Sequence, residues 1–191
     1  NQLGLPLFIK PANMGSSVGV SKADNRDSFY AGLAEAFRYD HKVIVEEAIA
    51  GRELECAVLG NGRVGTSGVG EVNMASTDFY SYASKYENQE AQVFIPAPGM
   101  DDQLLAKLML VARNAYQAVG CEGMARVDMF LGEDDRVYVN EINTLPGFTN
   151  ISMYPKLWEE AGMKYPELIN ALIELALERG AREQALHKLK A

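Results

Sequence analysis

Residues 124–143 constrain the fold of this chain more than any other segment. On either side of a turn at residues 132–136, polar and apolar side chains alternate, which is typical of an antiparallel β-hairpin. If the strands pair about the middle of that turn, Asp128 faces Glu141 and Arg126 faces Asn143. Successive side chains of a strand point to opposite faces, so these four polar groups share one face. The other face is then core and carries Val127, Met129, Leu131, Tyr138 and Ile142.

The polar face of this hairpin has the composition of a magnesium site. Carboxylate and amide oxygens suit Mg²⁺, which takes few protein ligands and shares phosphate oxygens. Facing carboxylates also destabilise a sheet unless something cationic lies between them. Two alternatives remain open: an ordinary charged surface, and a structural salt bridge from Arg126 to Asp128. The turn that follows, residues 144–149, lies at a strand end, where chemistry is common.

Composition excludes several classes of protein. The 191 residues are 48% hydrophobic, enough for one large domain or two small ones. A net charge of −8 argues against a general nucleic-acid surface. No apolar run is long enough to span a bilayer, and no signal-peptide pattern opens the chain, so we expect neither a nucleic-acid nor a membrane partner. The absence of an initial Met suggests a fragment or a processed chain.

Cys56 and Cys121 do not have metal-ligand spacing. We expect free thiols in a reducing, cytoplasmic environment, with one disulfide as the alternative.

The order of the expected elements indicates an α+β fold with mostly antiparallel strands flanked by helices. A helix capped by Asp24 or Asn25 should bury Phe29, Leu33 and Phe37. Residues 71–92 carry many aromatic side chains and little periodicity, which favours a functional lid loop. The remaining expected elements are strands at 5–10, 43–45, 52–59 and 63–68, the last two joined at Gly60-Asn61-Gly62, and helices at 101–119, 152–162 and 165–179, the last with Leu168, Leu172, Leu175 and Ala176 inward.

A series of short motifs, in a fixed order, resembles the ATP-grasp ligases and most closely the D-alanine–D-alanine ligase family. The series is Phe8-Ile9-Lys10-Pro11, Gly15-Ser16-Ser17-Val18-Gly19, Val45-Glu46-Glu47, Gly51-Arg52-Glu53, Ala83-Ser84-Lys85-Tyr86, Ala125-Arg126-Val127-Asp128 and Asn140-Glu141-Ile142-Asn143-Thr144-Leu145-Pro146-Gly147. The resemblance implies an ATP-grasp fold, with residues 1–46 as the later part of the central subdomain and residues 47–191 as the C-terminal catalytic subdomain. It also implies that an N-terminal domain is missing, so this chain should not catalyse alone.

The family chemistry would be the ATP-dependent ligation of two D-alanines through an acyl phosphate, for peptidoglycan precursors. The resemblance implies ATP and two Mg²⁺ ions as cofactors, with Mn²⁺ as a substitute metal. The implied metal ligands are Asp128, Glu141 and Asn143. The implied ATP-binding residues are Lys10, Ser17, Glu46, Glu47, Ile49, Glu53 and Lys85.

By the same resemblance, catalysis would use Arg126, Gly147, Lys85, Tyr86 and Ser16, with Arg126 and the Gly147 amide stabilising an oxyanion. The second substrate would meet Ser152, Leu145 and Met153. The family also implies a cytoplasmic homodimer in the full-length protein. The alternatives are another ATP-grasp ligase, such as a D-alanine–D-lactate ligase, and a nucleotide-binding fragment without activity of its own; Tyr86 favours D-alanine as second substrate.

Overall fold

The computed structural model describes residues 3–74 and 91–187. Contacts divide the chain into two compact units. The first contains Asn1–Ala50 and Asn73–Gln92, and the second contains Gly51–Val72 and Val93–Ala191. The expected subdomain division at residues 46 and 47 stays a prediction. No helix in the described part of the chain is long and apolar enough to cross a membrane.

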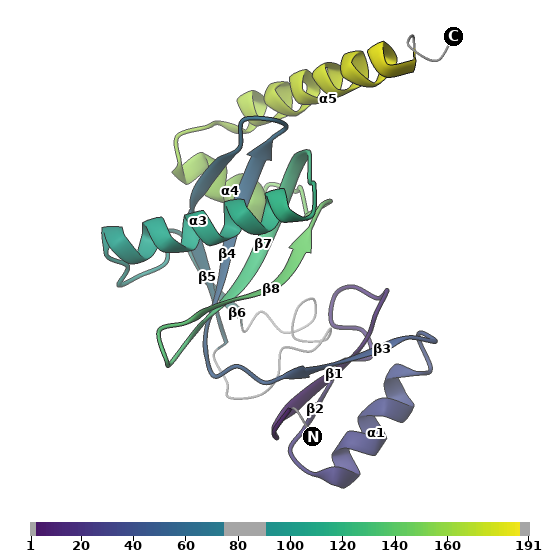
Figure 1. The fold of residues 1–191 in the computed structure, drawn as a ribbon. Coiled ribbons are helices and arrows are strands. Elements are labelled where there is room, and N and C mark those ends of the chain that lie inside the picture. The colour runs from purple at the N-terminus through teal and green to yellow at the C-terminus, as the bar shows by residue number, and fades with distance from the viewer. Residues whose placement is uncertain (1–2, 75–90, 188–191) are drawn as a thin grey trace. The chain divides into compact units, whose positions relative to one another are not determined.

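The described part of the first unit is a small antiparallel sheet with helix α1 (Figure 1). Its strand order is β2 (Ser21–Ala23), β1 (Leu7–Pro11), β3 (Val43–Glu47). Ile9, at the centre of β1, is fully buried with Ala23 and with Ala36 of α1 (Arg26–Ala36). Helix α1 therefore covers the apolar face of the three-stranded sheet.

Helix α1 begins where the sequence predicts and ends at Ala36. Asn25 caps it by accepting from the amide of Ser28, whose hydroxyl accepts in turn from the Asn25 amide. The predicted burial of Phe37 is wrong, because the helix ends at Ala36 and the Phe37 side chain is 56% exposed. Phe29 and Leu33 do pack against the core of this unit.

The second unit contains a five-stranded sheet, and every strand pair in the two sheets whose register is known is antiparallel. The order is β6 (Ala91–Phe94), β5 (Gly65–Met74), β4 (Gly51–Gly60), β7 (Gly123–Gly132), β8 (Val137–Asn143). The antiparallel α+β prediction is confirmed. Strand β5 continues to Met74, into the segment expected to be loop; residues 75–90 of the expected lid lie outside the described residues.

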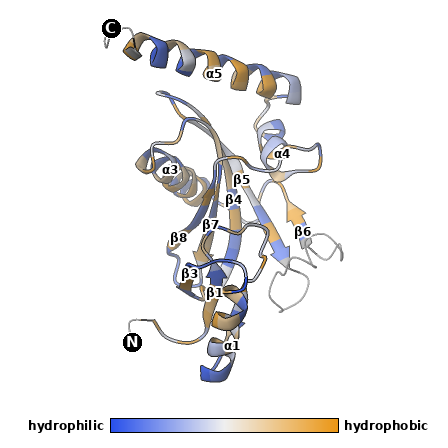
Figure 2. Ribbon diagram, turned by 90° about the vertical axis from the view of Figure 1, so that its right-hand side faces the viewer, coloured by the Kyte–Doolittle hydropathy of each residue, from blue (hydrophilic) through white to orange (hydrophobic). Residues whose placement is uncertain are grey.

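The two faces of this sheet have different coverings, as Figure 2 shows for α3 and α4. Helix α3 (Asp102–Ala118), which Asp101 caps, lies where the sequence predicts a helix and packs on the face that carries Leu54, Val127 and Met129. It also buries Tyr116, which the sequence analysis did not assign to the core. The other face is covered at one end by α4 (Met153–Glu160), through the cluster Ala57, Leu59, Met153, Tyr154, Leu157 and Trp158. The remainder of that second face carries the polar residues of the hairpin.

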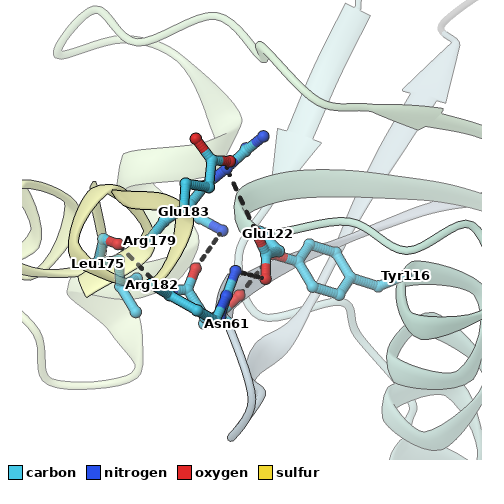
Figure 3. A network of polar contacts seen from close by, with 9 residues as sticks. Asn61, Tyr116, Glu122, Leu175, Arg179, Arg182 and Glu183 are labelled. Carbon is cyan, nitrogen blue, oxygen red and sulfur yellow. Dashed lines mark hydrogen bonds and ion pairs between the residues drawn. The ribbon is translucent and has the colours of Figure 1, made fainter. Parts of the chain in front are cut away.

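Helix α5 (Tyr165–His187) extends beyond the predicted end at residue 179. Leu168 is fully buried and Leu172 and Leu175 pack beside it, as predicted, but Ala176 is exposed. Figure 3 shows how this helix is held: Asn61 donates to the Leu175 carbonyl at 2.9 Å and accepts from the Gly123 amide at 3.1 Å.

Candidate functional site

The hairpin of β7 and β8 brings the four polar residues together in the predicted register. Arg126 pairs with Asn143, and Asp128 pairs with Glu141. The strands are joined by a tight turn in which Gly132 donates to the Arg136 carbonyl at 2.9 Å. The local pairing therefore places two carboxylates, a guanidinium and an amide on one sheet face.

A β-bulge makes one part of the hairpin prediction wrong. The register shifts between Asp128 and Met129, so that Met129 pairs with Val139 and Phe130 pairs with Tyr138. Tyr138 therefore leaves the core face, and its hydroxyl donates to Asp134 at 2.9 Å. The bulge sits directly beside the acidic pair, as bulges often do near active sites.

Arg126 is held mainly by Asp128. Its Nε and Nη2 each donate to a separate carboxylate oxygen of Asp128 at 2.7 Å, a bidentate pair. Burial opposes the charged form of Arg126, but the hydrogen bond and charge of Asp128, with the charges of Glu55 and Glu141, prevail and raise its pKa. The salt bridge considered from the sequence is therefore present, within the same cluster as the candidate metal ligands.

Asn143 connects the two carboxylates of the hairpin. Its Nδ2 donates to Asp128 at 3.0 Å and to Glu141 at 3.0 Å. This one amide therefore offsets part of the repulsion between the facing acids.

Glu55 is a further acidic residue of this face, and the sequence analysis did not assign it a role. On β4 it pairs with Asp128, and its Oε2 lies 3.1 Å from Arg126 Nε. Glu53, the candidate ribose ligand, pairs with Phe130 on the same face. The alternation of Glu53 and Glu55 in the sequence was the available signal, but only the pairing of β4 with β7 shows which acids become neighbours.

The chemistry of the donor set fits a divalent cation that also binds phosphate. Within residues 3–74 and 91–187, no group of three or more His, Cys, Asp and Glu is arranged to hold a metal. Asn143, the third ligand predicted from the sequence, lies beside Asp128 and Glu141 and would complete a donor set of two carboxylates and one amide. Mg²⁺ typically takes few oxygen ligands from a protein and completes its coordination with phosphate oxygens and water. The Asn143 amide presents nitrogen to both carboxylates, so it must turn to present its oxygen.

The loop after β8 places Gly147 against Ser152. A Cβ added to Gly147 would lie 3.0 Å from Ser152 Oγ. The Ser152 hydroxyl accepts from the Thr149 amide at 3.0 Å and lies 2.9 Å from the Thr149 hydroxyl. Gly147 is exposed and lies close to the Ser152 hydroxyl, so one small ligand can reach both residues.

The two residues expected to shape the pocket of the second substrate differ in burial. Leu145 is 85% exposed, whereas Met153 is 8% exposed within the α4 core. Leu145 is accessible to a ligand, whereas Met153 packs into the cluster between α4 and the sheet.

In the first unit, two candidate nucleotide ligands contact each other. Lys10 Nζ lies 2.8 Å from Glu46 Oε1, because β1 and β3 pair Phe8 with Glu46 and so place Lys10 on the same face. Glu47 ends β3 and is exposed, and Ile49 follows it in the connection to β4. A cation and a carboxylate are thus available on one strand face.

The loop before β2 has an unusual backbone. Ser16 and Ser17 have φ of 55° and 59°, and Gly19 has φ of 71°. Positive φ is uncommon for residues other than Gly and often marks functional sites. Ser16 is exposed, so its hydroxyl is accessible. Lys85 and Tyr86 lie outside the described residues.

The chain resembles known proteins along most of its length. Residues 1–174 match the family model described as D-ala D-ala ligase C-terminus. The chain is 59% identical over 188 residues to D-alanine--D-alanine ligase A of Chromobacterium violaceum, covering 98% of this chain and 51% of that protein.

Solved structures of similar fold are ligases of the same kind. The D-alanine-D-alanine ligase from Coxiella burnetii superposes with a TM-score of 0.84 at 40% identity, over 96% of this chain and 48% of that one. The VanG D-Ala:D-Ser ligase from Enterococcus faecalis superposes with a TM-score of 0.83 at 37% identity, over 91% of this chain and 50% of that one. The chain therefore spans about half the length of the relatives it matches.

Proposed function

Since this chain belongs to the D-alanine–D-alanine ligase family, whose C-terminal model it matches over residues 1–174, we propose that the protein containing it joins two D-alanines at the expense of ATP. The product, D-alanyl-D-alanine, would serve peptidoglycan precursor synthesis in the cytoplasm. The observation that carries this proposal is the cluster of Arg126, Asp128, Glu141 and Asn143 on one face of the β7–β8 hairpin.

The reaction has two chemical steps. The γ-phosphoryl group of ATP passes to the carboxylate of the first D-alanine, and the amine of the second attacks the resulting acyl phosphate. The tetrahedral intermediate then expels phosphate and leaves the dipeptide and ADP. Positioning and charge neutralisation supply most of the rate in such transfers.

On the nucleotide side, Lys10 neutralises phosphate charge and Glu46 accepts from the adenine amino group. The backbone of Glu47 and Ile49 binds the adenine edge, and Glu53 accepts from a ribose hydroxyl. Lys10 and Glu46 lie on the same strand face, with Nζ and Oε1 2.8 Å apart, so this face offers a nucleotide both a cation and a carboxylate.

The loop at residues 15–19 would cover the phosphates with backbone amides and the Ser17 hydroxyl. Its positive φ angles support this role, since such turns direct amides towards anions. Ser16 would position the lid residue Tyr86, and Lys85 would meet the transferring phosphoryl group. These lid assignments depend on the sequence motif alone.

The hairpin would supply the metal ligands. Asp128, Glu141 and Asn143 would hold two Mg²⁺ ions, or Mn²⁺ in their place, which neutralise phosphate oxygens during transfer. Arg126 and the Gly147 amide donate to the oxyanion of the tetrahedral intermediate. Ser152 donates to the carboxylate of the second D-alanine, and Leu145 borders it.

The assembled protein would be a homodimer. This chain alone would bind nucleotide without completing the reaction, because the relatives are about twice its length.

One experiment tests the proposal. The whole protein is incubated with ATP, Mg²⁺ and D-alanine, alone or with an excess of D-lactate or D-serine, and the products are identified by mass spectrometry. We expect D-alanyl-D-alanine and D-alanine-dependent release of phosphate. A depsipeptide or D-alanyl-D-serine as the main product would replace the proposed second substrate, and no D-alanine-dependent ADP would refute the proposal.

A further inference from the structure

The Arg126 guanidinium is surrounded by acids from three neighbouring strands. Asp128 binds it with two hydrogen bonds of 2.7 Å, and Glu55 on β4 lies 3.1 Å from its Nε. Glu55, Asp128 and Glu141 form one row across the sheet, because β4 pairs Glu55 with Asp128 and β8 pairs Glu141 with Asp128. Arg126 therefore has more than one acidic neighbour.

Asp128 already uses most of its acceptor capacity in this arrangement. Both its oxygens accept from Arg126, and one also accepts from Asn143. A divalent cation on Asp128 needs at least one of these oxygens and repels the guanidinium. If the metal site of the proposed function is correct, this repulsion weakens the pairing of Arg126 with Asp128 in the state in which Arg126 has to donate to the oxyanion.

Glu55 is placed to hold Arg126 in that state. It is 6% exposed and lies on a strand with neighbours on both sides, so its carboxylate is fixed in place. Its other register partner is Gly70 on β5, where the side chains of Met153 and Leu157 fill the position that a Cβ would take, so Glu55 is packed on that side as well. A buried carboxylate on a rigid element keeps a charged partner in position better than a mobile surface acid.

We propose that Glu55 is a positioning residue, which keeps the Arg126 guanidinium on the sheet face when a metal ion takes Asp128. It has no contact with substrate in this role and acts through Arg126. The inference deepens the proposed function and rests on it for the metal.

The first test replaces the metal by a mutation, so it does not depend on the ligase activity. The Asp128→Asn substitution removes the negative charge of the Asp128 carboxylate, which a bound cation would neutralise. Exchange of the Arg126 Nε–H is followed by NMR in the 191-residue chain. We expect a protected signal in Asp128→Asn and in Glu55→Gln, and loss of that signal in the double variant. A signal that stays protected in the double variant overturns the proposal.

The second test measures the reaction in the whole protein. Loss of a group that orients an active residue typically costs roughly 10- to 100-fold in activity, so we expect Glu55→Gln to lower kcat by that factor. The KM for ATP should stay within about twofold of the parent, since Glu55 does not contact nucleotide. Glu55→Asp keeps the charge and should restore most of the activity; failure of this rescue in a folded variant overturns the proposal.

Glu71→Gln is the matched control. Glu71 is buried to a similar degree, at 8% exposed, and Arg52 binds it with two hydrogen bonds. It pairs with Leu54 and therefore lies on the face of the sheet that α3 covers, away from Glu55. Its loss should lower stability and leave kcat unchanged. An equal fall in kcat in both variants means that Glu55 is only structural. Absence of dipeptide with the parent protein would refute the ligase proposal, and the exchange test would still decide the role of Glu55.

Discussion

Gly147→Ala tests whether the loop after β8 is positioned as tightly as the structure indicates. The backbone of Gly147 does not need a positive φ, so alanine adds a methyl group without backbone strain. That methyl group would lie 3.0 Å from Ser152 Oγ and 3.6 Å from Ser152 Cβ. Ordinary contacts begin near 3.4 Å, so the hydroxyl must move by about 0.4 Å.

Moving the Ser152 hydroxyl should lower both the stability of the protein and the rate of the reaction. Ser152 Oγ accepts from the Thr149 amide at 3.0 Å, and a weakened hydrogen bond costs about 0.5–1.5 kcal/mol of stability. A misplacement of about 1 Å can cost about 100-fold in rate, so a shift of this size corresponds to roughly 5- to 10-fold. Because Ser152 is proposed to bind the second D-alanine, the KM for D-alanine should rise as well.

The assay is steady-state phosphate release by the whole protein with varied D-alanine. Gly180→Ala is the matched control, since a Cβ added there meets nothing within 4 Å. The substitution also replaces a glycine in the interior of α5 by a better helix former. The control should gain roughly 0.5–1 kcal/mol of stability and keep its rate. Parent-like kcat and KM for D-alanine in Gly147→Ala would refute the reasoning.

Other changes test separate parts of the chain. Glu141→Gln should lower turnover of the whole protein by about 100- to 1000-fold through loss of a metal-bridging charge; unchanged turnover at limiting Mg²⁺ would show that Glu141 binds no metal. Asn61→Ala removes the contacts to the Leu175 carbonyl and the Gly123 amide, and should lower the free energy of unfolding in urea by about 1–3 kcal/mol; parent-like unfolding would show that this network (Figure 3) adds nothing. Burial raises the pKa of Cys56 to about 12, against a smaller opposing effect of its hydrogen bond with Ser67, and burial also raises the pKa of the more accessible Cys121. A thiol reagent at pH 8 should therefore label Cys121 first and Cys56 only after unfolding; early labelling of Cys56 would contradict its burial.

The features that the sequence predicted correctly are those that local rules decide. Asp128 and Glu141 face each other because one short turn sets the register of both strands. Helix starts were also predictable, since Asn25 and Asp101 cap through side-chain contacts three residues away. The free state of Cys56 and Cys121 is likewise confirmed.

The features that it missed depend on partners that are distant along the chain. Glu55 joins the site through the pairing of β4 with β7, which no local pattern specifies. Tyr138 left the core because a bulge changed the alternation. Ala176 is exposed and Tyr116 is buried because the width of an apolar helix face depends on the elements that pack against it.

The polar face of the hairpin is difficult to explain as structure alone. Glu55, Asp128 and Glu141 carry three formal negative charges against the single positive charge of Arg126, and Asp128 is only 4% exposed. Glu55 and Asp128 are both buried, whereas Glu141 is exposed, and burial of two like charges is costly. Proteins usually keep such local conflicts where function requires them. An excess of negative charge beside oxygen donors is the arrangement that a divalent cation relieves, so the cost of this face in stability is itself an argument for a metal-dependent role.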